Sequence, residues 1–182
     1  MKKVIMGVGV PGSGKTTLLK TFWERNGRKS GYVYISPDEI RKKLYKDAPF
    51  DPAKNDEVWS LARDQVKNAL FASKTVVFDS TFANVHQRRE FISFSRACGA
   101  ERIEGIFVDV PPEIAKERNR ERGQRGEKMV PDDVIELMHN QLERNDPGTI
   151  DGFDAIFQIG SDGELLQTDL YREGRYLTRK FL

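Results

Sequence analysis

Hydrophobic positions along the chain alternate between short apolar runs and stretches in which apolar residues recur with the period of a helix. The apolar runs have the length of buried strands and lie at residues 4–8, 32–35, 75–78, 103–110 and 153–159. The helical stretches lie near residues 18–23, from residue 37 onward, and at 54–73, 85–97, 112–122 and 131–145. Strands that alternate with helices form βαβ units. We therefore predict an α/β fold with a mostly parallel central sheet, flanking helices and ligands at the carboxyl ends of the strands.

The pattern changes in the tail, residues 160–182. Residues 165–170 and 175–178 resemble two strands around a turn at Gly174, which predicts a C-terminal β-hairpin. No repeat, low-complexity tract or linker divides the chain, and 182 residues with 38% hydrophobic content suit one core. We therefore expect a single domain over residues 1–182.

Composition excludes some classes of protein. The formal net charge is only +2, so composition alone requires no nucleic-acid partner. A single cysteine, Cys98, cannot form an internal disulfide, which favours a reducing compartment. The mean hydropathy is −0.59, the apolar runs are short, and the N-terminus shows no signal-peptide pattern. We therefore expect a cytoplasmic protein with no membrane span.

Charge is distributed unevenly along the chain. Residues 1–30 carry seven Lys or Arg and one acid, whereas residues 131–170 carry ten acids and only Arg144 as a base. This asymmetry predicts one basic and one acidic region.

The turn after the first predicted strand carries a phosphate-binding motif. Residues 9–16, GVPGSGKT, fit G-x-x-x-x-G-K-[ST] and lie between a predicted strand and a predicted helix. In such a loop backbone N–H groups surround phosphate oxygens, Lys15 reaches the β- and γ-phosphates, and the Thr16 hydroxyl binds Mg²⁺. The predicted nucleotide-binding residues are Gly12, Ser13, Gly14, Lys15, Thr16 and Thr17. The motif does not decide whether the nucleotide is hydrolysed, sensed or used as a phosphoryl donor.

A helix that follows the second predicted strand carries a candidate base. Ser36 and Glu39 have the spacing of a capping box, and Pro37 stands at the first helical position. Asp38 and Arg41 share one face of this helix and project toward the γ-phosphate, where the Asp38 carboxylate could accept a proton from a hydroxyl. The alternative is that Asp38 only stabilises the helix dipole.

Asp79 closes the third predicted strand. An acid in this place near a phosphate-binding loop commonly holds the water shell of Mg²⁺ or an acceptor group, although it could also only cap the strand. His86 and His139 have no companion at ligand spacing, so neither supports a zinc site.

Residues 112–130 form a charge-rich segment with an unusual pattern. Acids and arginines each recur four residues apart, at Glu113, Glu117 and Glu121 and at Arg118 and Arg122. Like charges thus line up where an isolated helix prefers opposite charges, which indicates an external anion. Gly123 and Gly126 then predict a hinge-like loop, so we expect a lid that closes arginines over a phosphoryl group. The alternative is a solvated helix held by ion pairs.

Together these residues resemble the P-loop kinases of the polynucleotide 5′-kinase type. The resemblance covers about residues 3–145 and rests on residues 9–16, 36–41, 79–81, 118–123 and 130–131. It implies a three-layer P-loop kinase fold with an arginine-bearing lid. In this fold ATP and the acceptor approach the P-loop from opposite sides.

The resemblance also implies roles for single residues. Asp38 would be the general base for a 5′-hydroxyl, and Arg41 would bind the phosphate next to it. Lys15 and Thr16 would bind the ATP phosphates and Mg²⁺. The implied catalytic residues are Lys15, Asp38, Arg41 and Arg122, and the implied metal residues are Thr16 and Asp79.

Arg118 and Arg122 resemble the lid arginines of the family, which contact the donor phosphates as charge moves in the transition state. The sequence departs from the family at Phe82, where many relatives have Asn, and the spacing of residues 79–81 is not shared by every member.

The function predicted first is transfer of the γ-phosphoryl group of ATP to the 5′-hydroxyl end of DNA or RNA, with Mg²⁺. A positive surface for the polynucleotide would come from Lys20, Arg25, Arg28, Lys29, Arg41, Lys42, Lys43, Arg88 and Arg89. Two alternatives stay open: a small-molecule kinase acting on a nucleoside, sugar acid or nucleotide-sugar, and a non-kinase ATP-binding switch. The C-terminal hairpin could pair with the edge of the sheet, with a second copy of the chain in a homo-oligomer, or with a separate repair partner.

Overall fold

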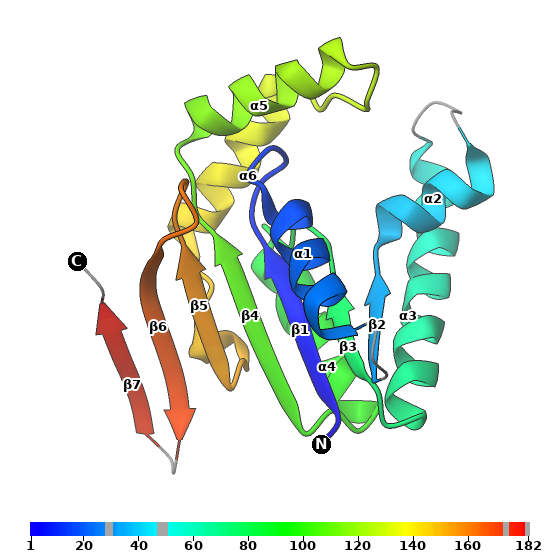
Figure 1. Cartoon of the computed structure of the whole chain (residues 1–182), viewed down its shortest axis with the longest axis vertical. Helices are drawn as coiled ribbons and strands as arrows, with labels where there is room; N and C mark the ends of the chain where they lie inside the picture. The colour runs from blue at the N-terminus through cyan, green and yellow to red at the C-terminus, as the bar shows by residue number, and fades with distance from the viewer. Residues whose placement is uncertain (28–30, 47–50, 173–174, 181–182) are drawn as a thin grey trace.

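A seven-stranded sheet forms the centre of the computed structural model, which describes residues 1–27, 31–46, 51–172 and 175–180 (Figure 1). The strands are β1 (Lys3–Val8), β2 (Tyr32–Ile35), β3 (Thr75–Phe78), β4 (Arg102–Val108), β5 (Ala155–Ile159), β6 (Leu165–Arg172) and β7 (Arg175–Lys180). Their order is β2-β3-β1-β4-β5-β6-β7, parallel from β2 to β5 and antiparallel from β5 to β7. The predicted α/β fold with a mostly parallel sheet is confirmed.

The helices lie where the hydrophobic period predicts them. They are α1 (Lys15–Gly27), α2 (Pro37–Tyr45), α3 (Asn55–Phe71), α4 (Val85–Ala97), α5 (Pro112–Gln124) and α6 (Asp132–Arg144), with short 3-10 turns η1 (Pro52–Lys54) and η2 (Thr149–Asp151). The predicted end of α5 is wrong by two residues, because the helix continues through Gly123 and ends before the left-handed Gly126. Within the described ranges, no helix combines the length and the apolar character needed to cross a bilayer.

The start of α2 differs from the prediction. Ser36 is the N-cap residue, but its side chain makes no capping hydrogen bond, so the predicted capping box is wrong. The carboxylate of Glu39 instead pairs with Lys20 of α1 at 2.5 Å. Pro37 at the first helical position and the acids Asp38 and Glu39 of the first turn favour the start of this helix.

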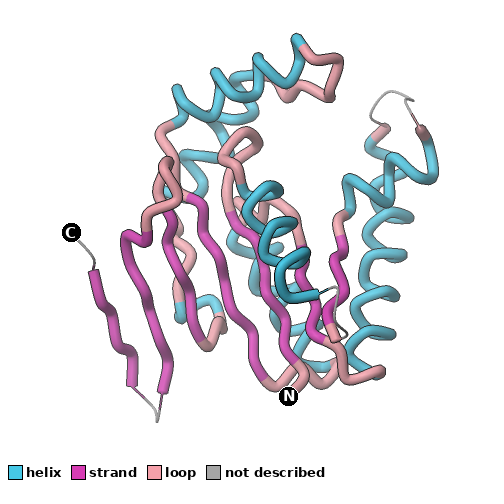
Figure 2. The backbone as a smooth tube through the Cα atoms, viewed as in Figure 1, coloured by secondary structure: helices cyan, strands magenta, loops and turns pink. Residues whose placement is uncertain are grey.

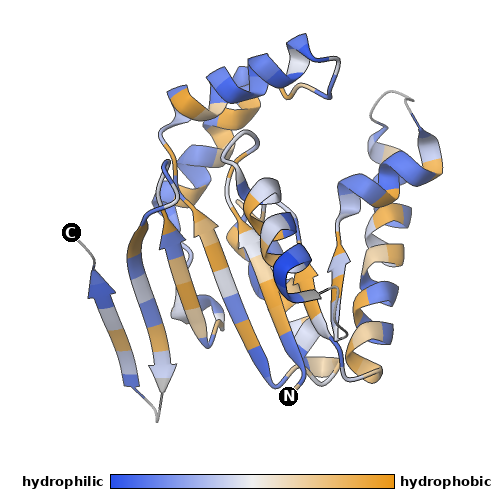
Figure 3. Ribbon diagram, viewed as in Figure 1, coloured by the Kyte–Doolittle hydropathy of each residue, from blue (hydrophilic) through white to orange (hydrophobic). Residues whose placement is uncertain are grey.

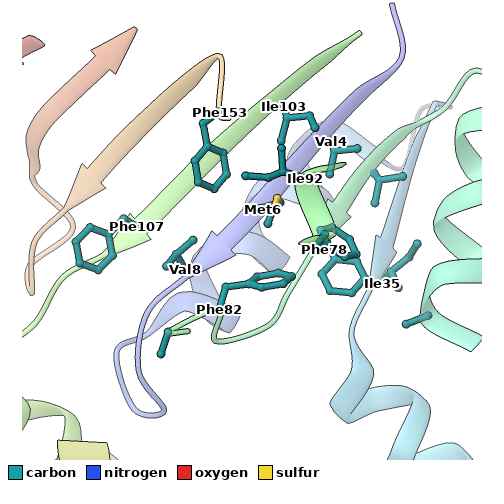
Figure 4. Packing of buried hydrophobic residues seen from close by; sticks show 14 of the residues in the cluster. Val4, Met6, Val8, Ile35, Phe78, Phe82, Ile92, Ile103, Phe107 and Phe153 are labelled. Atoms are coloured by element: carbon teal, nitrogen blue, oxygen red, sulfur yellow. The ribbon is translucent and has the colours of Figure 1, made fainter. Parts of the chain in front are cut away.

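The two faces of the sheet pack against different helices because the side chains of a strand alternate. Val4, Met6 and Val8 of β1 belong to the large core, where they meet apolar residues of α3, α4 and α6. Ile5 points to the other face and packs with Leu19 of α1. Figure 1 shows α1 in front of the sheet, and Figure 4 shows residues of the large core from close by, including Phe78 and Phe82. This pairing of strands and helices produces the three layers.

The tail forms the predicted hairpin. β6 pairs with β5 and β7, and the turn residue Gly174 lies outside the described residues. Every residue of β7 is exposed, and Figure 3 shows that apolar colour becomes sparse toward this edge of the sheet. In Figure 2 loops gather at the upper end of the sheet, where the parallel strands end. A ligand site is expected at that end.

The charged residues contradict part of the predicted surface. Arg88 is fully buried on α4 and donates to Asp151 at 2.9 Å and to the carbonyl oxygens of Phe82, Ala83 and Asn145. It is therefore not available to a polynucleotide. Its role is to hold the loop after β3 against η2 and the end of α6.

Four of the other predicted surface charges lie at two places in the chain. Arg28 and Lys29 lie outside the described residues, whereas Lys42 and Lys43 of α2 are exposed.

The acids of residues 131–170 do not form a single uncompensated region. Several of them pair with cations of α4 and α5, through Asp132–Arg120, Glu136–Lys116, Asp151–Arg88 and Asp154–Arg96.

Replacing Arg88 by Met should lower the free energy of unfolding by about 3–5 kcal/mol, because the buried Asp151 and three carbonyl oxygens lose a charged donor. Arg89→Met is the matched control. It removes the half-exposed guanidinium that pairs with the same Asp151 and should cost less than about 1 kcal/mol. Urea unfolding of both variants measures the difference, and equal losses would contradict this role of Arg88.

Candidate functional site

A cleft of about 910 Å³ opens at the carboxyl ends of the parallel strands. The loop after β1, the start of α1, the lid helix α5 and the turn between β5 and β6 form its walls. Nine of the predicted site residues line it: Gly12, Ser13, Gly14, Lys15, Thr16, Thr17, Asp38, Arg118 and Arg122. The other two do not line the cleft but pair with residues that do: Arg41 with Asp38, and Asp79 with Lys15.

The backbone of the P-loop requires glycine at two crowded positions. Gly9 has φ +146°, and a Cβ there would lie 2.8 Å from the carbonyl oxygen of Val108. Gly12 has φ +83°, and a Cβ there would lie 2.1 Å from the carbonyl oxygen of Ala115. The loop is thus pressed against β4 on one side and α5 on the other. A side chain at either position would push the loop out of the shape that encloses phosphate.

The P-loop offers hydrogen-bond donors of the kind that phosphate requires. The first helical hydrogen bond of α1 runs from the N–H of Leu18 to the carbonyl oxygen of Gly14. The N–H groups of Lys15, Thr16 and Thr17 therefore have no acceptor within the helix. The Ser13 hydroxyl is buried and has no partner in the described part of the molecule. These groups, together with the positive end of the helix dipole, fit an anion such as a nucleotide phosphate.

A buried pair lies beneath the loop. The ammonium of Lys15 is 3.7 Å from one carboxylate oxygen of Asp79, and both side chains are almost fully buried. The hydroxyl of Tyr34 donates to the other oxygen at 2.6 Å. Burial and the charge of Asp79 raise the pKa of Tyr34 well above its ordinary value, so this donor keeps its proton. Asp79 is therefore held by two groups, with one oxygen directed to the P-loop lysine.

A magnesium ion would find a suitable donor set here. The hydroxyl-bearing Thr16 is exposed to the cleft, and the strand-end carboxylate of Asp79 lies next to Lys15. Oxygen donors of this kind suit Mg²⁺, which usually keeps several waters and is bound also by substrate phosphates. Among the described residues no group of three or more His, Cys, Asp or Glu could hold a metal without such help.

Asp38 and Arg41 lie together on α2 at the rim of the cleft. The Asp38 side chain is 80% exposed, and a guanidinium nitrogen of Arg41 contacts its carboxylate at 2.5 Å. The second terminal nitrogen of Arg41 donates to Asn55 of α3 at 2.9 Å. The sequence did not indicate Asn55 or Tyr34 as site residues. Nothing in the local pattern reveals them, because their partners lie fourteen and forty-five residues away.

The lid is present, but its arginines have partners. Arg118 donates to the carbonyl oxygens of Ser13 at 3.3 Å and Ser161 at 3.1 Å, which joins the P-loop to the turn between β5 and β6. Arg122 and Arg125 both pair with Glu127, at 3.3 and 3.2 Å. The hydrogen bond from Arg125, followed by the one from Arg122, lowers the pKa of Glu127 below its usual value. Arg122 therefore faces the cleft with a carboxylate beside it, and an incoming phosphate would compete with that exposed contact.

Comparison with known proteins gives consistent matches. The model of a family described as "AAA domain" matches residues 4–145. A putative bifunctional polynucleotide phosphatase/kinase of Acanthamoeba polyphaga mimivirus is 27% identical over 144 residues, which are 79% of this chain and 29% of that protein. The chain thus spans less than a third of this relative.

Solved structures share the fold. A chain of the Pnkp1/Rnl/Hen1 RNA repair complex superposes with a TM-score of 0.70 at 23% identity, over 84% of this chain and 46% of that one. A tunicamycin resistance protein of Deinococcus radiodurans superposes with a TM-score of 0.55 at 21% identity, over 79% of this chain and 81% of that one.

Replacing Gly12 by Ala should destabilise the fold more than the same change at Gly126. Both glycines have positive φ, but only Gly12 has a backbone atom in the space that a Cβ would occupy. Gly126→Ala should cost about 1–2 kcal/mol for the left-handed backbone, and Gly12→Ala about 1–3 kcal/mol more for overpacking against α5. Urea unfolding measures the loss in free energy of unfolding for both variants. Equal losses would show that the loop does not pack tightly against the lid helix α5.

Proposed function

This chain belongs to the AAA domain family and is a P-loop kinase domain related to polynucleotide kinase, and we propose a specific reaction for it. In this reaction the chain transfers the γ-phosphoryl group of ATP to a 5′-hydroxyl end of DNA or RNA. The observation that carries the proposal is the position of Asp38, which lines the same cleft as Lys15 and the lid arginines. A proton acceptor and a phosphate-binding loop thus share one space.

On the donor side the protein supplies positive charge and hydrogen-bond donors. Lys15 and the N–H groups at the start of α1 hold the β- and γ-phosphates, and Arg118 and Arg122 approach from the lid. Thr16 and Asp79 would hold Mg²⁺, which would supply further charge neutralisation at the phosphates. The lid also excludes water, which would otherwise compete with the acceptor.

On the acceptor side, Asp38 accepts the proton of the acceptor hydroxyl while the hydroxyl oxygen forms a bond to the γ-phosphorus. At the same time the bond between the γ-phosphorus and the bridging oxygen breaks, and ADP leaves with that oxygen. Arg41 holds the Asp38 carboxylate by an ion pair. The exposed Lys42 and Lys43 follow on the same helix and offer charge to the acceptor's phosphates. A small-molecule acceptor would use Asp38 in the same way, so the test includes one.

Replacing Asp38 by Asn should reduce transfer at least about a hundredfold, because the amide keeps the shape of the side chain but accepts no proton. ATP binding should stay unchanged, since Asp38 acts on the acceptor. The measurement is transfer from γ-labelled ATP with Mg²⁺ to a short 5′-hydroxyl oligonucleotide, beside nucleosides, sugar acids and water. Normal turnover in the variant would remove Asp38 from the mechanism, and label on a small acceptor alone would replace the polynucleotide as substrate.

Replacing Arg122 by Ala should slow transfer by about tenfold to a hundredfold, because charge that develops on the phosphoryl group loses a donor. Arg120→Ala is a matched control on the same helix, since Arg120 pairs with Asp132 of α6 and does not line the cleft. The rate constant of a single turnover measures the effect. Equal rates for the wild type and the Arg122 variant would exclude the lid from the reaction.

A further inference from the structure

The candidate base stands in an unfavourable place for precise chemistry. The Asp38 side chain is 80% exposed on the first turn of α2, where an isolated carboxylate would sample several rotamers. A general base must lie within hydrogen-bond reach of the proton that it accepts, so free rotation would reduce the rate. Something must therefore hold Asp38 toward the cleft.

Arg41 is the group that holds it. Its side chain is only 19% exposed, and it contacts the Asp38 carboxylate at 2.5 Å from one turn farther along α2. Both residues lie on the same helix, however, and an exposed pair at this spacing contributes only a few tenths of a kcal/mol. The pair by itself is too weak to fix the long Arg41 side chain.

Asn55 supplies the missing anchor from a different element. Its side-chain oxygen accepts a hydrogen bond of 2.9 Å from the second terminal nitrogen of Arg41. The N-cap of α3 is Lys54, so the Asn55 side chain is not required to begin that helix. The planar guanidinium is thus held at two of its nitrogens by groups from two helices, which fixes its plane as well as its position.

We propose that Asn55 is a positioning residue for phosphoryl transfer, which orients Arg41 and, through Arg41, the carboxylate of Asp38. This inference rests on the proposed function, because it takes Asp38 to be the base. It predicts that Asn55 affects the rate of transfer and not the binding of ATP, since the P-loop is built from other elements.

A purely structural role makes a different prediction. α2 and α3 are also joined by a hydrogen bond from Tyr45 to Glu57, which does not involve Arg41. If Asn55 only tied the two helices together, Tyr45→Phe would slow transfer as much as Asn55→Ala. If Asn55 positions Arg41, only the Asn55 variant should be slow.

The test is a double-mutant cycle on kcat with Asn55→Ala, Arg41→Ala and the double variant. Loss of a hydrogen bond to a charged group should lower kcat of Asn55→Ala about tenfold, with the KM for ATP unchanged. Asn55→Asp keeps an oxygen acceptor for Arg41 and should retain most activity, and Tyr45→Phe should match the wild type. In the Arg41→Ala background, Asn55→Ala should cause no further loss.

Three results would overturn the inference: an Asn55→Ala enzyme as fast as the wild type, a Tyr45→Phe enzyme as slow as Asn55→Ala, or losses that multiply in the double variant. The wild type controls for the proposed function. If it phosphorylates only a nucleoside or a sugar acid, the polynucleotide acceptor is wrong, and the same cycle on that acceptor still tests Asn55. A wild type that labels no acceptor would overturn both proposals.

Discussion

The close packing of the loop after β1 is the constraint on which the rest of the site depends. Gly9 donates its N–H to Thr81 at 2.9 Å, which joins the loop to the segment after β3. The approach of Gly12 to the carbonyl of Ala115 joins the loop to the lid helix. Because the loop allows no side chain at these contacts, the positions of Lys15 and of Arg118, which donates to the carbonyl oxygen of Ser13, depend on this one backbone conformation.

The two sides of the cleft differ in how firmly they are built. The side that we propose for the phosphoryl donor contains buried groups, such as Lys15 and Asp79. The side that we propose for the acceptor contains the exposed carboxylate of Asp38 on α2, which pairs with Arg41, and Arg41 in turn donates to Asn55. A phosphoryl donor of constant shape suits the first arrangement. An open rim suits an acceptor that continues beyond its reacting end, which in our proposal is a polynucleotide.

Much of this architecture could be predicted from the sequence, because it depends on local patterns. Alternating apolar runs and helical periods predicted the strands and helices, and the P-loop motif predicted a phosphate site in the loop that now lines the cleft. The rest depends on contacts between distant segments. The burial of Arg88 could not be predicted, since its acidic partner Asp151 lies sixty-three residues away. Tyr34 and Asn55 could not be predicted for the same reason. The predicted capping box of Ser36 and Glu39 was wrong, because the Glu39 carboxylate pairs with Lys20 of α1.

The identity of the acceptor can be determined from the salt dependence of its KM, because an oligonucleotide carries phosphates and a nucleoside carries none. The apparent affinity for a 5′-hydroxyl oligonucleotide and for a nucleoside should be measured as KM between low and moderate salt. If Lys42 and Lys43 neutralise phosphates of a single strand, the logarithm of the oligonucleotide affinity should fall with the logarithm of salt with a slope of about −1.4, whereas the nucleoside should show almost no slope. The same shallow slope for both acceptors would contradict the account and favour a small-molecule substrate.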